Sequence, residues 1–394
     1  MVIKMKKLLI ILAALILLVS CAKDESSSGG DAKSAPSSES SGETNVKEYY
    51  SSTVGMWYEV LYSGKEQSEK LYQRHWFEDS RLTPVEDGYY SSADKVKIKK
   101  DLTYFQKIGI NYIILDDTNG HGNDDGNIAL ACDCVFQVAN EMGAANTPQV
   151  CFAAGRPLIN GDAAGMKGEM DIFYGYAKMY KDLYFQWRGL PLFVNFTDPV
   201  NYGYKDERFT IRVGSGVTSA GAPSAKKYGL DKNGMYGWVF DHQYPDSEVY
   251  GITPGWSRHH NNMFDTTYPE VSRENGARYQ RMWLEAVKAK KEMIVITGWN
   301  EHGEETGIEA VTLREPIKGR DFEHLNPYYY QQITEGYLAL KKGYLNDFYY
   351  KNEKEDQLYQ YKNGKLSKVD SVKQMTAVIV VPDDYFEWSG VQFA

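Results

Sequence analysis

Met293-Ile-Val-Ile-Thr-Gly-Trp-Asn-Glu301-His-Gly-Glu304-Glu-Thr-Gly-Ile-Glu309 is the stretch that says most about the fold of this chain. Its four leading apolar residues are typical of a short buried strand, and acids, an amide and an indole follow at once. Crowded carboxyl groups raise one another's pKa, and a carboxyl that keeps its proton near neutral pH can act as a general acid. The stretch therefore predicts a strand that ends in a catalytic loop, with Glu301 and Glu304 as the acid/base residues.

Strands and helices alternate along the chain before this loop. Apolar runs at 54–61, 110–115, 150–153, 192–196, 209–213, 237–240, 249–252 and 293–296 are interspersed with helical patterns at 92–108, 127–141, 168–184 and 278–291. This alternation indicates parallel strands, and eight of them predict an α/β fold of the (β/α)8 TIM barrel type over residues 47–344. Ser92 is the expected N-cap of the first helix and Gly109 its stop. A doubly wound open sheet is the alternative.

The composition changes after residue 344. Lys362-Asn-Gly-Lys365 is typical of a hairpin turn, and 376–381 of a further strand. We therefore expect a small C-terminal β appendage over residues 345–394.

Polar and aromatic residues follow six of the expected strands. The carboxyl ends of barrel strands share one face, which carries the active site in this fold. We therefore expect the following substrate-binding residues: Asp116, Asp117, Asn119, Arg156, Asp241, His242, Tyr244, Trp256, Trp299, Asn300 and Glu309. The alternatives are a capped turn for the first three, an ion pair with Asp116 or Asp117 for Arg156, and plain packing for Trp256.

No metal or cofactor is expected. The loop Asp117-x-Asn119-x-His121-Gly122 has a loose likeness to a calcium loop, but its histidine and the lack of a closing glutamate disfavour that interpretation. Cys132, Cys134 and Cys151 leave an odd number of thiols beyond residue 21, which disfavours a disulfide framework. Cys132 and Cys134 are expected to pack as small apolar residues of a helix, since no histidine follows them at zinc spacing.

The first residues indicate where the protein is located rather than how it folds. Three lysines precede an apolar run at 8–19, which is shorter than the ~20 residues of a membrane span and ends in Leu-Val-Ser-Cys21. This ending resembles the lipobox of bacterial lipoproteins, in which the cysteine is lipidated; a plain signal peptide is the alternative. The sequence thus predicts a signal peptide at 1–20, lipidation of Cys21, a disordered tether at 21–46 and a body held outside the cytoplasm on a bacterial membrane.

The composition indicates which kinds of partner the chain can bind. The formal net charge of -9 disfavours nucleic acid, because no basic stripe is available to neutralise phosphates. The chain has 31 Tyr and 8 Trp, whose flat faces suit sugar rings, although most of them are expected to fill the core. We expect a monomer that acts on a polysaccharide or oligosaccharide.

The loop at 299–309 resembles the Trp-Asn-Glu-Trp-x-Glu-Gly-Thr-x-Ile-Glu motif of glycoside hydrolase family 99 and its relatives, which include family 71. Pro254-Gly-Trp256 and the segments 54–58 and 81–90 are similar to further parts of the same group. The resemblance extends over about residues 49–340 and is specific in the last motif. It implies a (β/α)8 barrel and a retaining, endo-acting cleavage of α-mannan-like chains.

The resemblance also implies a mechanism. Glu301 would take a proton from the substrate 2-hydroxyl, which attacks the anomeric carbon to give a 1,2-anhydro sugar. Glu304 would protonate the leaving oxygen and later activate water, which departs from the usual two-carboxylate scheme. His302, Glu305 and Ala310 stand where the family pattern has Trp, Gly and Pro. An inverting α-glucanase and a non-catalytic carbohydrate-binding lipoprotein of the same fold are therefore the alternatives.

Overall fold

The computed structural model describes residues 47–196, 204–214, 247–257, 271–314, 326–373 and 376–394, together with the backbone of 235 and 236. The chain divides into two units, Met1–Asn45 and Val46–Ala394, and the fold below belongs to the second. The expected signal peptide, Cys21 and the tether lie outside the described residues. None of the described helices combines the length and the apolar composition needed to cross a bilayer.

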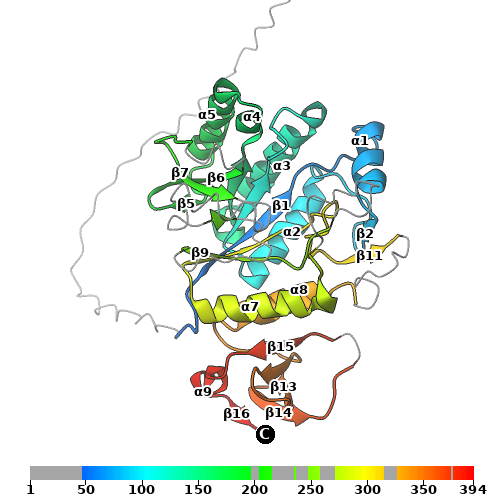
Figure 1. The fold of residues 1–394 in the computed structure, drawn as a ribbon, viewed down its shortest axis with the longest axis vertical. Helices are drawn as coiled ribbons and strands as arrows, with labels where there is room; N and C mark the ends of the chain where they lie inside the picture. Colours follow the sequence, from blue (N-terminus) through cyan, green and yellow to red (C-terminus); the bar gives the residue numbers. More distant parts are fainter. Residues whose placement is uncertain are drawn as a thin grey trace, which may run out of the picture. The chain divides into compact units, whose positions relative to one another are not determined.

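A curled parallel sheet forms the centre of the second unit (Figure 1). Its strand order is β8-β7-β6-β4-β3-β1-β10-β9, so β1 pairs with β10 on one side and β3 on the other. The parallel strands are β1 (Thr53–Glu59), β3 (Tyr112–Asp116), β4 (Gln149–Ala154), β6 (Leu190–Phe196), β7 (Thr210–Gly214), β8 (Met235–Tyr236), β9 (Val249–Ile252) and β10 (Met293–Ile296). The short β5 (Gln186–Trp187) adds an antiparallel edge to β6.

The ring of strands is not closed by hydrogen bonds in the described part of the chain. β8 and β9 stand at the two ends of the paired order, and Cα atoms of the two strands come within 8 Å of each other. No ladder joins them among the described residues, and the predicted strand 237–240 lies outside the described residues. The expected (β/α)8 barrel is thus confirmed as an α/β fold with a curled parallel sheet, whereas the closed ring is not detected.

Helices connect most of these strands and bury one face each against the sheet. Ile98, Leu102 and Phe105 of the helix at Lys95–Ile108 recur three and four residues apart, and each is at most 1% exposed. The main helices are α2 (Lys95–Ile108), α3 (Asn127–Met142), α5 (Ala163–Met179), α7 (Ala277–Ala289) and α8 (Tyr329–Ala339). Shorter pieces are α4 (Arg156–Ile159) and the 3₁₀ turns Asp124–Gly126, Ala144–Asn146 and Glu274–Gly276.

Most predicted boundaries agree with the structure to within a few residues, and two helix starts differ. Asp94, not Ser92, caps α2, because its carboxyl accepts hydrogen bonds from the first turn. Ser92 instead accepts from the backbone N–H of Tyr62 at 3.1 Å. Gly109 ends α2 in the left-handed conformation, as predicted, with φ 96°. The helix expected at 168–184 begins earlier, at Ala163, because Asp162 caps it, and it also ends earlier, at Met179.

An insertion between β1 and α2 lies under the loop that follows β10. It consists of α1 (Glu69–Gln73), a π-helical turn (Arg74–Glu78) and β2 (Leu82–Pro84), which pairs with β11 (Val311–Leu313). The ring of Tyr62 stacks on Trp76 at 4.2 Å, and its hydroxyl donates to the carbonyl of Asn300 at 3.0 Å. The insertion therefore fixes the backbone that leads into Glu301.

A five-stranded sheet with the order β15-β12-β13-β14-β16 follows α8. Asn363 and Gly364 have φ of 51° and 82° and turn the chain between two of its strands, which confirms the predicted hairpin. The hydroxyl of Tyr337 on α8 donates to the carbonyl of Val380 at 2.9 Å and so ties the small sheet to the helix. The elements are β12 (Tyr349–Asn352), β13 (Leu358–Lys362), β14 (Lys365–Val369), β15 (Val378–Val381), α9 (Tyr385–Ser389) and β16 (Gln392–Phe393).

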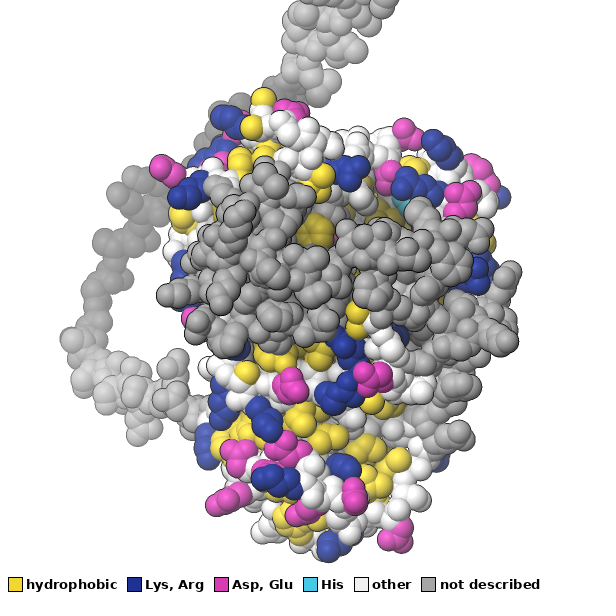
Figure 2. Space-filling view, in the orientation of Figure 1, with side chains coloured by type: hydrophobic (Ala, Val, Ile, Leu, Met, Phe, Trp, Pro, Cys, Tyr) yellow, Lys and Arg dark blue, Asp and Glu magenta, His cyan; other side chains and the backbone are white. Residues whose placement is uncertain are grey.

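Aromatic rings occupy much of the core, as expected from the composition. Tyr112 of β3 stacks on Phe185 at 3.9 Å, and Trp283 of α7 stacks on Tyr337 at 5.6 Å. Acidic and basic side chains are interspersed over the described part of the surface that Figure 2 shows.

Candidate active site

Three carboxyl groups meet at the C-terminal ends of neighbouring strands. Glu59 is the last residue of β1, Asp116 is the last of β3, and Glu301 follows β10. These side chains are 2%, 5% and 6% exposed, and their charges act on one another. The sequence prediction missed Glu59, because the expected strand 54–61 ran through it. An acid within an otherwise apolar strand was the available signal.

Glu59 and Asp116 form a hydrogen-bonded carboxyl pair. Burial, followed by the charges of Asp116 and Glu301, raises the pKa of Glu59 well above its usual value. Burial also raises the pKa of Asp116, although hydrogen bonds from Thr118 and Glu59 oppose the shift. Glu59 is therefore the proton donor of the pair, and its Oε1 has no hydrogen-bond partner.

Glu301 is held neutral by its surroundings. Burial, followed by the negative charge of Glu304, raises the pKa of Glu301 to about 8. The backbone N–H of Glu304 donates to Glu301 Oε1 at 2.8 Å, which fixes the direction of the carboxyl. A Cβ at Gly303 would lie 2.9 Å from the same oxygen, so a glycine leaves room for this side chain. Glu301 consequently retains its proton at neutral pH.

Glu304 is partly exposed and is oriented by an indole. Trp256, which follows β9, donates from Nε1 to Glu304 Oε2 at 2.8 Å. The backbone N–H of Ser257 donates to the carbonyl of Glu304 at 2.9 Å. Trp256 itself is 4% exposed and packs on Phe196 and Val271. This indole therefore belongs to the site by holding a carboxylate, a role that the sequence prediction did not specify.

An arginine fixes the loop that carries both glutamates. Arg273 is 5% exposed, and its guanidinium donates to the carbonyl of Glu305 at 2.7 Å and to that of Gly307 at 2.7 Å. Glu305 has a φ of 54° and Gly298 a φ of 79°, so the loop bends sharply at both ends. Arg273 was not predicted, because it lies between the seventh strand and the next helix, where its partners cannot be read from the sequence.

Comparisons with known proteins add information on the fold. No family model matches this chain, and no curated protein matches it. A solved structure of the family 99 endo-α-mannosidase from Bacteroides thetaiotaomicron in complex with bis-tris-propane superposes with a TM-score of 0.54 at 18% identity, covering 73% of this chain and 96% of that one. A second structure of that enzyme gives a TM-score of 0.54 at 17% identity, with the same coverage. The fold is glycoside hydrolase-like.

Asn300 connects strands of this glycoside hydrolase-like fold. It is 0% exposed, its Oδ1 accepts from the backbone N–H of Glu59 at 2.8 Å, and its Nδ2 donates to the hydroxyl of Tyr90 at 3.2 Å. The amide is thus occupied in holding β1 to the loop after β10. Asn300 is therefore a positioning residue for the carboxyl cluster, the name used below for Glu59, Asp116, Glu301 and Glu304.

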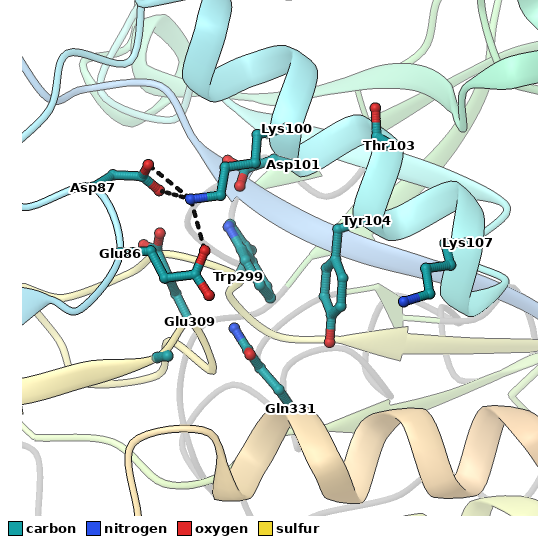
Figure 3. Close-up of a pocket in the computed structure, with 11 residues that line it drawn as sticks. Glu86, Asp87, Lys100, Asp101, Thr103, Tyr104, Lys107, Trp299, Glu309 and Gln331 are labelled. Atoms are coloured by element: carbon teal, nitrogen blue, oxygen red, sulfur yellow. Dashed lines mark hydrogen bonds and ion pairs between the residues drawn. The ribbon is translucent and has the colours of Figure 1, made fainter. Parts of the chain in front are cut away.

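Trp299 lies on the helical side of the sheet. Its ring contacts Tyr104 and Phe105 of α2 at centroid distances of 5.4 and 4.9 Å. It lines a cavity of about 300 Å³ between α2 and α8, which none of the four carboxyl groups Glu59, Asp116, Glu301 and Glu304 lines. Figure 3 shows Lys100 between Glu86 and Asp87 above this cavity, with Tyr104 and Gln331 beside Trp299.

Glu309 lines the same cavity and belongs to a buried ion cluster. Lys97 Nζ lies 2.8 Å from its Oε1, and His302 Nε2 and the Tyr90 hydroxyl lie 3.0 and 2.8 Å from its Oε2. Burial opposes ionisation, but Lys97 and His302 outweigh it and lower the pKa of Glu309 to about 2. Lys97 also binds Asp101, at 2.5 Å. These groups stabilise the fold and are not directed at the carboxyl cluster.

The remaining predicted site residues are dispersed. Asp117 is 0% exposed and pairs with His121, whose Nδ1 lies 2.6 Å from its Oδ2. Asn119 and Arg156 are exposed, and in the described part of the chain no ion pair joins Arg156 to Asp116 or Asp117. The other three residues, Asp241, His242 and Tyr244, lie outside the described residues.

Proposed function

We propose that this chain is a glycoside hydrolase that cleaves an α-linked, mannan-like polysaccharide internally and with retention of configuration. One observation carries the proposal: four carboxyl groups gather at the C-terminal ends of β10, β1 and β3, and burial raises the pKa of two of them, Glu59 and Glu301. Pairs of carboxyls with separated pKa values supply both the acid and the base of glycoside cleavage.

The proposed roles follow the family resemblance. These roles require the one proton shared by the two glutamates to lie on Glu304: ionised Glu301 then takes the proton of the substrate 2-hydroxyl, and protonated Glu304, held by Trp256, gives its proton to the leaving oxygen. A pKa of about 8 supports Glu301 as a base, because a base whose pKa lies near the working pH has the largest drive to accept a proton. The pair of Glu59 and Asp116, in which Glu59 holds the proton, offers hydrogen bonds to sugar hydroxyls and carries one negative charge instead of two.

Activity tests the proposal directly. The purified protein is incubated with α-mannans, α-glucans and capsular polysaccharides, and reducing ends and product sizes are measured. We expect oligosaccharide products from one α-linked polymer, and Glu304→Gln is expected to lower kcat/KM by at least ~10³-fold. Glu141→Gln, an exposed change on α3, is the control and should leave the rate unchanged.

Two results would contradict this proposal. A polymer that binds and is never cut, with the same affinity for Glu304→Gln, identifies a carbohydrate-binding protein instead. Proton NMR of the first product distinguishes retention from inversion, and an inverted first anomer favours the α-glucanase alternative.

The pH dependence of kcat/KM separates the two possible roles of Glu301. If Glu301 is the base, the free enzyme must lose its proton, so kcat/KM rises as the pH increases through about 8. If Glu301 is the acid, kcat/KM falls over the same range. The measurement is kcat/KM at constant ionic strength across this range, for the wild type and for Glu301→Gln. A profile without a change near pH 8 would contradict both roles.

The proposal includes attachment to a bacterial membrane through a lipid on Cys21. Such an anchor holds a polysaccharide-degrading body at the surface by a tether rich in Ser and Gly. We expect the wild type in the membrane fraction of producing cells and Cys21→Ala in the soluble fraction. Equal amounts of both variants in the membrane fraction would argue for a different attachment.

A further inference from the structure

Asp117, His121 and Cys132 come together between the sheet and α3. Asp117 follows β3 directly, His121 lies four residues later, and Cys132 is on α3. One potential ligand atom of each residue lies within 4.8 Å of those of the other two, and all three residues are buried. The three side chains offer an oxygen, a nitrogen and a sulfur to one point.

One polar atom of these three residues has no hydrogen-bond partner. His121 Nδ1 lies 2.6 Å from Asp117 Oδ2. The other carboxylate oxygen, Oδ1, has no hydrogen-bond partner, although Asp117 is 0% exposed. A buried polar atom without a partner is costly and uncommon, and an unfilled ligand position accounts for it.

We propose that Asp117, His121 and Cys132 bind one divalent transition-metal ion of the zinc class. Thiolate and imidazole ligands suit Zn²⁺ and Co²⁺, whereas Mg²⁺ and Ca²⁺ prefer oxygen alone. The fourth position of a tetrahedral site is left for water. The Cys132 thiol releases its proton on binding, since the thiolate is the ligand.

The distances allow this site after a small contraction. Metal–ligand bonds of ~2.0 to ~2.3 Å place tetrahedral ligands roughly 3.3–3.8 Å apart. Ligand atoms at most 4.8 Å apart therefore approach one another by about 1–1.5 Å.

The groups around Asp117, His121 and Cys132 resemble those that orient the ligands of a metal site. The ring of His121 meets Phe173 edge-on at 5.7 Å, and its backbone N–H donates to Glu169 Oε1 at 3.4 Å. Apolar rings exclude water, and a fixed backbone limits the orientations of the imidazole. A bound ion would connect the loop after β3 to α3, next to Asp116 of the carboxyl cluster.

Cobalt(II) provides the test, since its thiolate complexes have a charge-transfer absorption band. The full-length protein is titrated with CoCl₂, and zinc binding is measured by equilibrium dialysis with metal analysis. We expect one ion per chain and the thiolate–cobalt band in the wild type. Cys132→Ala is expected to lose the band and to bind zinc at least ~100-fold more weakly.

Cys134→Ala is the matched control, because it removes another thiol of α3 that is not part of the trio. It should keep both the band and the zinc affinity. Circular dichroism and thermal unfolding verify that each variant folds; if Cys132→Ala does not, the isosteric Asp117→Asn takes its place, with at least ~10-fold weaker zinc binding expected. The proposal is overturned if the wild type binds no stoichiometric metal, or if Cys132→Ala and Cys134→Ala bind it equally.

Discussion

Glu301→Gln is expected to abolish hydrolysis and, at the same time, to stabilise the fold. The amide can neither take up nor release the proton on which the proposed chemistry depends, so kcat/KM should fall by at least ~10³-fold. Glutamine has the same shape and keeps an oxygen that can accept from the backbone N–H of Glu304. The gain in stability comes from removing a carboxyl that the folded state cannot easily ionise.

The pH dependence of this stability gain follows from the difference in proton binding between the folded and the unfolded chain. The pKa of Glu301 is about 8 in the folded chain, above the value of 4.5 for a free glutamate side chain. Between these values the folded protein holds a proton that the unfolded chain has lost, so the stability conferred by this proton declines as the pH rises. Glu301→Gln avoids the decline. We expect its advantage to be absent near pH 4 and to reach on the order of 4 kcal/mol near pH 8.

Denaturant unfolding at both pH values measures this effect, with hydrolysis assayed on the same preparations. Glu141→Gln is the control and should change neither quantity. An active Glu301→Gln would remove this residue from the chemistry. An inactive variant without a gain in stability at high pH would show that Glu301 is ionised in the free protein.

Lys97→Met is expected to cause the largest loss of stability. The ammonium of Lys97 is 3% exposed and lies 2.8 Å from Glu309 and 2.5 Å from Asp101. Its removal leaves two carboxylates buried without their cation, which costs about 3–5 kcal/mol. The loss should be smaller near pH 5 than near pH 8, because the two carboxyls can then take up protons.

Lys100→Met on the same helix is the matched control. Lys100 is exposed and pairs with Glu86 at 2.7 Å and Asp87 at 2.9 Å, and exposed pairs contribute about 1 kcal/mol or less. Urea unfolding of both variants and the wild type checks the prediction. Equal effects of the two substitutions would mean that the buried cluster contributes no more than a surface ion pair.

The strands with the clearest patterns could be predicted from the sequence. The predicted 293–296 and 249–252 coincide with β10 and β9, because a short apolar run between polar residues leaves little freedom at its ends. The start of α2 was wrong by a few residues. Ser92 and Asp94 are both good caps, and only the position of Tyr62 shows which of them the helix uses.

The candidate site was predicted in part. Glu301 and Glu304 lie at the carboxyl end of β10 as expected, and Trp256 contacts Glu304. Trp299 and Asn300 are adjacent to Glu301 in the sequence, yet Trp299 points to α2 and Asn300 binds β1. Successive residues of an extended loop face different sides, so proximity in the sequence does not imply a shared cavity.

The sequence by itself determined the alternation of strands and helices, the polar residues expected after six of the strands and the acids at 301 and 304, because these depend on local periodicity and residue type. The tertiary structure alone decided which carboxyls meet. Glu59 and Asp116 become partners because β1 and β3 are neighbours, and burial then sets their protonation. The same holds for His121 and Cys132, which lack zinc spacing in the sequence and meet where the loop after β3 folds over α3.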